Sequence, residues 1–313
     1  MKNFNLLNPA VPPTRGTTKK LLFISNTADE KERFYVFQGS KIGYKFWQDI
    51  YLKGKIIATL GAVNCIANDF ADSKKIVKSG VTKKIIQLVA EAVKKDFLIF
   101  VLGASTKYVQ NKLQKMFTNC IFLGGNELTA TAIILQEKFF LNQDKNVLIL
   151  GGSTSLATLN AQLLQNFMPV DNIRPSARGD ETELAKKFFN TPFDPVSFVD
   201  IYNGFRTKQL LNSIHISLLE VKDFKRLGVE ICLEVARPTV YKNVCTKLNI
   251  RWAQLGIFEH QELTWEKELY DTKQHGLFAC FLAGYIYSQY KVLDPVKALK
   301  LAMADGFTLQ HIK

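Results

Sequence analysis

The chain has 313 residues, of which 47% are hydrophobic and 22% charged, so it is long enough for two globular domains and too apolar to be disordered. Lys and Arg outnumber Asp and Glu by 41 to 28, and the net charge of +13 indicates an acidic or phosphorylated partner or, alternatively, lysine-rich solvated helix faces. The five cysteines include no C-x-x-C pair, which argues against a structural zinc site, so we predict no metal.

Residues 1–18 predict an extended arm, because they contain three prolines and lack the apolar core of a secretory signal. Apolar runs elsewhere, such as Phe97 to Leu102, are far too short to span a bilayer. The expected location is therefore cytoplasmic, with no transmembrane segment.

Residues 19–135 predict an N-terminal α/β domain. Its expected strands are Leu21–Ser25, Phe34–Phe37, Lys55–Leu60 and Phe97–Leu102, and helices are expected over 73–95, over Lys107–Met116 and from Asn126 to about Leu141. Segment 73–95 is the most basic stretch of the chain. Its lysines are Lys74, Lys75, Lys78, Lys83, Lys84, Lys94 and Lys95. These lysines indicate either a solvated face or a docking surface for an acidic partner.

The central stretch, Lys145–Leu164, predicts a strand, a tight turn and a helix. Four apolar residues, Val147–Leu150, are followed by two glycines and then by leucines at helical spacing. Such a turn lets the backbone approach a pyrophosphate, and the helix N-terminus offers amide donors to it. Thr154 and Ala157 stand where a G-x-x-G-x-x-G pattern has its second and third glycines, and a threonine resists both close approach and a positive φ angle.

Further α/β alternation follows up to residue 262. We expect strands at Asn172–Arg174, Val196–Ile201, Ile214–Leu219 and Glu230–Val235, and helices at Glu181–Phe189 and Thr207–Asn212. This α/β alternation predicts a doubly wound parallel sheet, so residues 136–262 are expected to form a Rossmann-like nucleotide-binding domain. Residues 263–313 predict a C-terminal helical segment, with a buried helix over Gln274–Tyr290 and another that starts at Asp294-Pro295 and ends at Gly306.

Three blocks of sequence together resemble one protein family. They are GNELTATAIILQE at Gly125–Glu137, LGIFEHQELTW at Leu255–Trp265 and LFACFLAGYI at Leu277–Ile286, and the Ala-x-x-x-Gly-Phe of Ala302–Phe307 is similar too. From about residue 75 to Phe307 the chain resembles the long-chain fatty acyl–[acyl carrier protein] reductases of the cyanobacterial, aldehyde-forming type.

The resemblance implies NADPH-dependent reduction of a fatty acyl thioester to a fatty aldehyde through a cysteine acyl-enzyme. It implies Cys280 as the nucleophile, with a thiol pKa below that of a free cysteine. The residues implied for the cofactor are Gly151, Gly152, Ser153, Thr154 and Ser155 in the turn, with Arg174 or Arg178 for the 2′-phosphate. Those implied for the substrate are Asn126, Glu259 and His260, with a helix cap at Asn126 and a structural role at His260 as open alternatives.

The implied partners are an acidic acyl carrier protein or acyl-CoA, a peripheral membrane contact is a further expectation, and nucleic acid is not expected. Thr154 and Ala283 depart from the family pattern, which has a glycine and a glutamate there, and they leave a second interpretation open. That interpretation is a binding protein on the same fold that is non-catalytic or has altered specificity. A third is a related cysteine and NADPH reductase acting on another acyl thioester or a charged RNA.

Overall fold

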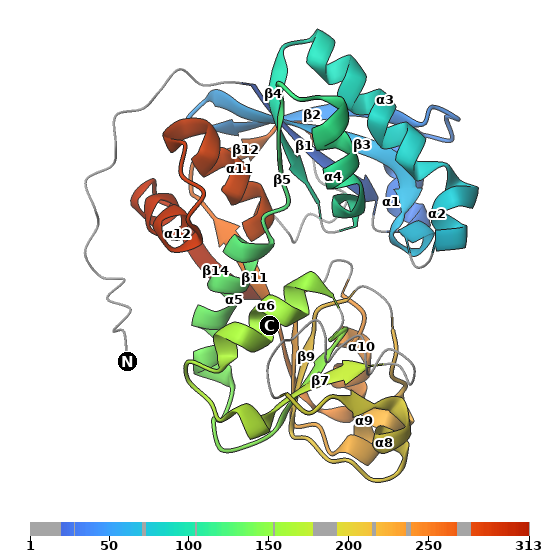
Figure 1. The fold of residues 1–313 in the computed structure, drawn as a ribbon, viewed down its shortest axis with the longest axis vertical. Coiled ribbons are helices and arrows are strands. Elements are labelled where there is room, and N and C mark those ends of the chain that lie inside the picture. Colours follow the sequence, from blue (N-terminus) through green and yellow to red (C-terminus); the bar gives the residue numbers. More distant parts are fainter. Residues whose placement is uncertain are drawn as a thin grey trace. The chain divides into compact units, whose positions relative to one another are not determined.

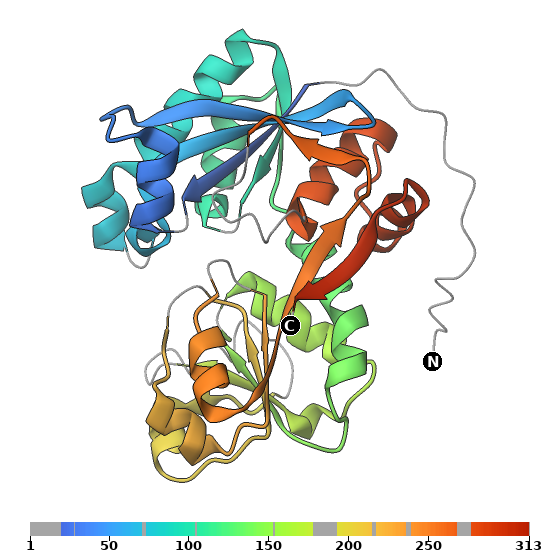
Figure 2. The same ribbon diagram turned by 180° about the vertical axis from the view of Figure 1, so that it is seen from behind.

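The structure is a computed structural model that describes residues 20–27, 29–70, 73–103, 105–152, 154–177, 193–214, 217–235, 239–267 and 277–312. The chain divides into two compact units: unit 1 comprises Met1–Leu128 and Phe258–Leu309, and unit 2 comprises Thr129–Ile257 and Gln310–Lys313. Figures 1 and 2 show the elements from opposite sides. The arm expected at residues 1–18 and the helix expected at Glu181–Phe189 lie outside the described residues.

Unit 1 is built on a mixed sheet, which among the described residues has the order β12-β2-β3-β1-β4-β5. These strands are β1 Lys20–Thr27, β2 Tyr44–Leu52, β3 Lys55–Ile66, β4 Phe97–Leu102, β5 Ile121–Leu123 and β12 Leu263–Trp265. Strands β3, β1, β4 and β5 run parallel, and β2 pairs antiparallel with β3 and with β12. The carboxyl ends of β4 and β5 therefore lie side by side at one edge of the parallel part of the sheet.

Helices cover both faces of this sheet. The described helical segments of unit 1 include α1 Glu30–Phe37, η1 Ala67–Phe70, α2 Ser73–Ser79, α3 Val81–Lys94, η2 Thr106–Val109, α4 Gln110–Met116, α11 Ala279–Tyr290 and α12 Pro295–Ala304. Helix α3 packs its buried face on Leu22 and Phe100, whereas α11 meets Phe23 and Val101. Because neighbouring strand residues point to opposite faces, the sheet lies between α3 and α11.

Helix α11 approaches the sheet very closely, and Gly284 permits this. A Cβ atom at Gly284 would lie only 1.9 Å from Cγ2 of Val101 in β4. Phe281, one turn earlier, makes an edge-to-face contact with Phe23 of β1, with ring centroids 5.8 Å apart. The residues at the start of α11 are therefore held at a fixed depth against the sheet.

Helix α1 replaces the strand that the sequence predicted at Phe34–Phe37. The side chain of Asp29 accepts a hydrogen bond from the N–H of Glu32 (2.8 Å), and Gln38 ends the helix in the left-handed conformation. This cap outweighs the strand preference of the aromatic residues, so the strand prediction is wrong.

Unit 2 contains a parallel sheet whose order is β8-β7-β6-β9-β10-β11 in the part of the chain that the structure describes. The strands are β6 Val147–Leu150, β7 Ile173–Ala177, β8 Val196–Ser197, β9 Gln209–Asn212, β10 Ile231–Glu234 and β11 Arg251–Glu259. Each neighbouring pair is parallel. Counted from β6, this is the order 3-2-1-4-5-6 of dinucleotide-binding Rossmann folds, so the predicted fold class is confirmed. Two short strands, β13 Leu277–Phe278 and β14 Thr308–Ile312, also pair with β11.

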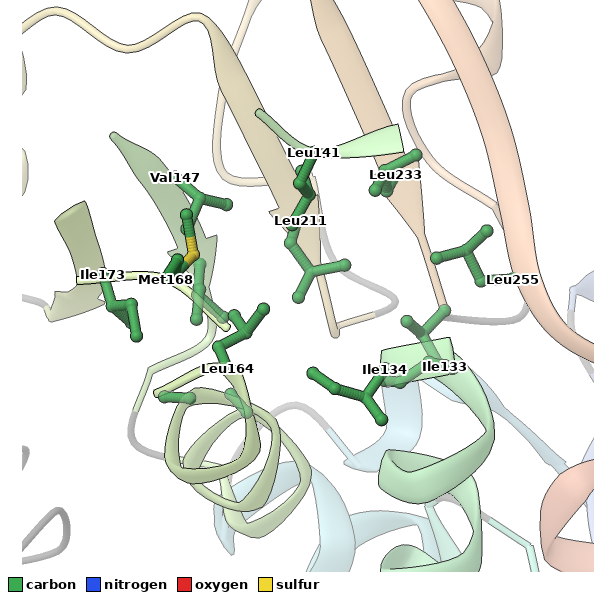
Figure 3. Close-up of a cluster of buried hydrophobic side chains, with 14 of the residues drawn as sticks. Ile133, Ile134, Leu141, Val147, Leu164, Met168, Ile173, Leu211, Leu233 and Leu255 are labelled. Atoms are coloured by element: carbon green, nitrogen blue, oxygen red, sulfur yellow. The ribbon is translucent and has the colours of Figure 1, made fainter. Parts of the chain in front are cut away.

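Two apolar clusters enclose the sheet of unit 2. Its helical elements within the described residues are α5 Asn126–Phe140, which begins in unit 1, α6 Ser155–Leu164, η3 Val170–Asn172, α8 Phe198–Tyr202, α9 Val221–Leu227 and α10 Lys242–Leu248. In Figure 3, Ile133 and Ile134 of α5 and Leu164 of α6 point toward strand residues such as Leu211. On the other face, Leu148 and Leu210 pack with residues of α9 and α10.

Three predicted elements of unit 2 need correction. Thr207–Asn212 was expected as a helix, but Gln209–Asn212 forms β9, a central strand. No strand occurs in the described part of Ile214–Leu219, and Val196–Ile201 contains a two-residue strand followed by α8. The side chain of Ser197 accepts from the N–H of Asp200, and this capping box starts α8.

Residues 263–309, expected as a separate helical segment, lie in unit 1 of the structure, because β12 extends its sheet and α11 packs on β1 and β4. None of the described helices is long and apolar enough to cross a membrane.

A carboxyl group lies fully buried between α5 and α6. The side-chain amide of Asn160 donates to both Glu137 oxygens at 3.0 Å, and burial raises the pKa of Glu137 to about 8. A raised pKa means that the folded state holds a proton that the unfolded chain loses at lower pH. The stability that this proton provides is present at acid pH and is lost as the pH rises toward 8.

We expect Glu137→Gln to remove this pH dependence, because glutamine does not titrate. In the native protein, the free energy of opening α5 and α6 should fall by roughly 3–5 kcal/mol between pH 5 and pH 8, and in the variant it should stay level. Hydrogen exchange of peptides from both helices, corrected for the intrinsic rate at each pH, measures this. Glu127→Gln, in the exposed first turn of α5, is the control and should keep the native slope. Equal slopes in native protein and Glu137→Gln would contradict the prediction.

Candidate functional site

The turn after β6 is shaped by two glycines whose hydrogen atoms face other parts of unit 2. Gly151 has φ +77°, and a Cβ there would lie 2.4 Å from Cγ2 of Ile214. A Cβ at Gly152 would lie 2.4 Å from the carbonyl oxygen of Ser176 in β7, which accepts the N–H of Gly152 at 3.1 Å. Packing within the protein therefore already requires both glycines.

Thr154 is the N-cap of α6, and its backbone is extended (φ −82°, ψ 148°). Its hydroxyl accepts the N–H of Ala157 at 3.3 Å, and its carbonyl accepts the N–H of Thr158 at 2.9 Å. No positive φ angle is needed at this position, so the objection to threonine on that ground does not apply. Ser155 follows as the exposed first residue of the helix.

A buried carboxylate organises the neighbouring loops at the carboxyl ends of β9 and β10. Glu234 accepts hydrogen bonds from the side-chain amide of Asn212 (3.0 Å) and the indole of Trp252 (2.6 Å). It also accepts the backbone N–H groups of Val240 (2.9 Å) and Tyr241 (3.2 Å). Since its oxygens accept four donors, Glu234 holds the end of β9 and the start of α10 together.

Asn212, which is held by Glu234, positions Ile214, the residue that packs against the glycine turn. Its side chain donates to the carbonyl of Ile214 (2.8 Å) and accepts the N–H of Ile214 (3.3 Å). Ile214 in turn lies against Gly151. The hydrogen bonds between Asn212 and Ile214, with the contact of Ile214 on Gly151, fix the chain directly after β9. This position, between the ends of β6 and β9, is the switch point at which open α/β sheets bind ligands.

Of the two arginines predicted to contact a 2′-phosphate, the structure describes Arg174 and not Arg178. Arg174 of β7 forms an ion pair with Asp194 (2.7 Å). Arg178 comes directly after β7 in the sequence but lies, like Ser153, outside the described residues. Of the predicted cofactor residues, the structure thus brings Gly151, Gly152 and Thr154 into one turn.

The described residues of unit 2 fit a dinucleotide through the strand order and the helix N-terminus at the switch point. The N–H groups of Gly151 and Gly152 already donate to Ser176. The first turn of α6 would therefore hold a pyrophosphate, by its backbone amides and by the positive end of the helix dipole. No group of His, Cys, Asp or Glu side chains in the described parts of the chain is suited to a metal ion.

A second cluster of functional groups lies in unit 1, at the carboxyl ends of β4 and β5. Cys280 is the second residue of α11, and its own backbone N–H and that of Phe281 favour the thiolate form of its sulfur. A Cβ at Gly125, which has φ +63°, would lie 2.6 Å from Cα and 2.8 Å from the carbonyl oxygen of Cys280. The turn after β5 is therefore packed directly against the start of α11.

Lys107 of η2 lies beside the same turn. Its amine donates to the side-chain oxygen of Asn126, the first residue of α5, and its stem passes 3.2 Å from the Cβ position of Gly124. Lys107, Asn126 and Cys280 are each half-buried. The structure thus brings together two predicted site residues, Asn126 and Cys280, and adds a cation to them.

Burial and charge act on Cys280 in opposite directions. Burial raises the pKa of its thiol, while the charge of Lys107 and the two backbone N–H groups lower it. Burial likewise lowers the pKa of Lys107, and Cys280 and Glu127 raise it. The net direction at Cys280 is upward, which differs from the lowered pKa expected from the sequence, because desolvation outweighs the cation.

The other four cysteines are fully buried, whereas Cys280 is partly accessible. Burial raises the pKa of Cys65 to about 12, and it also raises the pKa values of Cys120 and Cys232. Cys280 is therefore the cysteine best placed to meet a reactant.

His260 and Glu259 lie at the end of β11, where the structure gives His260 backbone partners. Its Nδ1 accepts the N–H of Glu262 (3.0 Å), so its Nε2 carries the proton that is donated to the carbonyl of Asp305 (3.0 Å). Phe307 packs on the ring, and Glu259 is exposed. A substrate role for either residue stays a prediction.

Segment 73–95 is only partly an exposed basic surface. Lys74, Lys75, Lys78, Lys83 and Lys94 are exposed on α2 and α3. Lys84 is half-buried and donates to the carbonyl of Asn64 (2.7 Å), and Lys95 pairs with Glu91 (2.9 Å). Binding of an acidic partner to these lysines stays a prediction.

Lys107 and Gly125 were not identified from the sequence. The signal for Gly125 was present, since Leu-Gly-Gly followed by a helix occurs both at Leu123–Gly125 and at Leu150–Gly152. Lys107 is one lysine among many in a basic stretch, and only its position in the fold distinguishes it.

No protein-family model matches the chain, and no curated protein matches it in sequence. Among solved structures, shikimate dehydrogenase from Mycobacterium tuberculosis has a TM-score of 0.45 at 10% identity, covering 91% of this chain and 99% of that one. Quinate dehydrogenase from Corynebacterium glutamicum in complex with NAD has 0.44 at 8%, covering 92% and 99%. L-Tryptophan dehydrogenase from Nostoc punctiforme has 0.42 at 10%, covering 91% and 80%. Similarity at this level assigns neither a family nor a substrate.

The assignment to the acyl–[acyl carrier protein] reductases is wrong. No sequence-level match supports it, and the similar solved structures include shikimate, quinate and tryptophan dehydrogenases instead. The short blocks that suggested it cover a glycine turn, a strand and a buried helix, which packing alone can explain.

We expect Gly125→Ala to disturb Cys280 as well as stability. A positive φ angle costs alanine about 1–2 kcal/mol, and the contact below 3 Å with the Cys280 backbone adds about 1–3 kcal/mol. Gly54→Ala is the matched control, because Gly54 also has positive φ (+71°) but faces open space. Denaturant unfolding should show the larger loss for Gly125→Ala, and alkylation of Cys280 should change rate in that variant alone. Equal losses with unchanged alkylation would contradict this.

Proposed function

We propose that the chain is an oxidoreductase that uses a nicotinamide dinucleotide bound at the carboxyl ends of β6 and β9. The observation that carries the proposal is the parallel order 3-2-1-4-5-6 with a glycine turn and a helix N-terminus at the switch point. The three solved structures described above are dehydrogenases by name, which is in keeping with this class.

The cofactor that we propose is NADPH. Arg178 follows the last residue of β7, the second strand counted from β6, where an arginine accommodates a 2′-phosphate. Arg174 is the weaker candidate, since Asp194 already pairs with it. Bound NADPH would supply hydride to a carbonyl group of the substrate.

Fluorescence titration with NADPH and NADH tests the cofactor proposal. We expect NADPH to bind more tightly, and Arg178→Ala to weaken NADPH by about 1.5–3 kcal/mol, roughly 10- to 150-fold, while NADH changes little. Arg206→Ala, which removes an exposed arginine in the loop before β9, is the control. Equal affinity for both nucleotides would refute the preference, and binding of neither would refute the cofactor site.

For the substrate we propose an acyl thioester, which Cys280 captures. A helix N-terminus, two backbone N–H groups at the sulfur and a neighbouring lysine are the surroundings of a nucleophilic cysteine. The sulfur would add to the thioester carbonyl, and the thiolate of the carrier would leave and take up a proton. Addition of hydride to the new Cys280 thioester and breakage of its C–S bond would release an aldehyde.

The carrier of the acyl group is a second part of this proposal. CoA and an acidic carrier protein are both anionic, and the exposed lysines of α2 and α3 suit either of them by charge. A charged RNA is not favoured by any described feature.

Intact-mass measurement tests acyl capture. Incubation with long-chain acyl-CoA in the absence of NADPH should add one acyl group to the protein, and NADPH should then release aldehyde. Cys280→Ser should lose both steps and still bind NADPH, whereas Cys120→Ser, at a buried cysteine of the same unit, should retain them. An adduct on another cysteine would refute the role of Cys280. A native protein that binds NADPH but forms no adduct would support a non-catalytic or different oxidoreductase function.

A further inference from the structure

Lys107 occupies an unusual place for a lysine, because its amine points into unit 1 rather than into solvent. The side chain is half-buried, passes Gly124 and donates to the Asn126 oxygen. An ammonium needs several acceptors to replace its water, and Asn126 supplies one. Cys280 and Glu127 both act on its charge and favour the protonated amine.

The arrangement is held from three sides. Thr106, the residue before Lys107, is buried, and its hydroxyl bonds the carbonyl of Gly103 (3.0 Å), which anchors η2 at the end of β4. Asn126 begins α5 directly after the glycine turn. On the third side, Gly284 and Gly125 let α11 approach the sheet and the turn, which places Cys280.

We propose that Lys107 accepts the thiol proton of Cys280 and that Asn126 holds the Lys107 amine in place for this transfer. The proposal rests on the proposed function only for its use in acyl capture. In that use, the proton moves from Sγ of Cys280 to Nζ of Lys107 as the C–S bond to the acyl group forms. The same proton then passes to the thiolate of the departing carrier, so Lys107 ends as it began.

The electrostatics around the pair support this transfer. Burial raises the pKa of the thiol and lowers that of the amine, so it favours the neutral form of both groups. The neutral amine is the form that can accept a proton, as a general base must. Glu127 favours the ammonium form, and the N–H groups of Cys280 and Phe281 favour the thiolate.

The test is the pH dependence of Cys280 alkylation by iodoacetamide in the full-length protein, with the site read by peptide mass. Lys107→Gln removes both the charge and the proton acceptor, and we expect its rate at pH 7 to fall at least about tenfold, with the pH midpoint moved upward. Lys107→Arg keeps the charge but cannot accept a proton, so it should be slow as well. An unchanged rate in Lys107→Gln, or full rescue by arginine, would overturn the proposal.

A second variant covers the case in which Lys107 variants do not fold. Asn126→Ala leaves both reacting groups and removes the acceptor that orients the amine, so its rate should fall severalfold without loss of the lysine. An unchanged rate in a folded Asn126→Ala protein would overturn the positioning role. Lys112→Gln, at an exposed lysine of α4, should behave like the native protein.

This experiment is independent of the proposed function, because alkylation requires neither dinucleotide nor acyl thioester. If the variants slow alkylation but the native protein forms no acyl adduct, acyl capture is refuted and the Lys107 role stands. If the native protein forms the adduct and the Lys107 variants alkylate normally, the proposed function stands and the Lys107 role is refuted.

Discussion

At two glycine turns the backbone of this protein comes closer to another segment than any side chain would allow. Gly125 touches the backbone of Cys280, and Gly152 touches the carbonyl of Ser176. Each turn follows a parallel strand with the sequence Leu-Gly-Gly and leads into a helix, once in each unit. Close contact fixes each turn, and the turns fix Asn126, the first residue of α5, and Thr154, the N-cap of α6. Both candidate sites depend on this constraint.

The sequence was sufficient to predict the central strand, its turn and the class of sheet, because a short apolar run followed by glycines has few other structures. It was not sufficient for β9. Gln209 and Asn212, at the two ends of that strand, are buried polar residues that each have a partner distant in sequence. Gln209 donates to the carbonyls of Asn142 and Lys145, and Asn212 donates to Glu234. Because both ends of β9 are polar, its sequence pattern did not indicate a fully buried strand.

The candidate sites show the same limit. Cys280 and Asn126 were named through a resemblance carried by short sequence blocks, whereas Lys107 matters only because the fold brings it to the turn after β5. At Thr154 the residue type suggested a conflict with a glycine pattern, but the structure shows none in the backbone. Its observed φ angle is an ordinary one for threonine. His260 binds two backbone groups, which no spacing in the sequence could indicate. Residue type indicates which chemistry is available, and only tertiary contacts decide where it is assembled.

The division of the chain has a consequence for synthesis on the ribosome. The chain passes between the units at Leu128/Thr129, Ile257/Phe258 and Leu309/Gln310, inside α5, β11 and β14 rather than in loops. Strand β2 obtains its partner β12, and β1 and β4 obtain α11, only after unit 2 has been made. A nascent chain must therefore hold an incomplete apolar sheet face while most of unit 2 emerges. The slow step of folding should be the closure of unit 1 over this long sequence separation, and a chaperone that binds exposed apolar surface would act there.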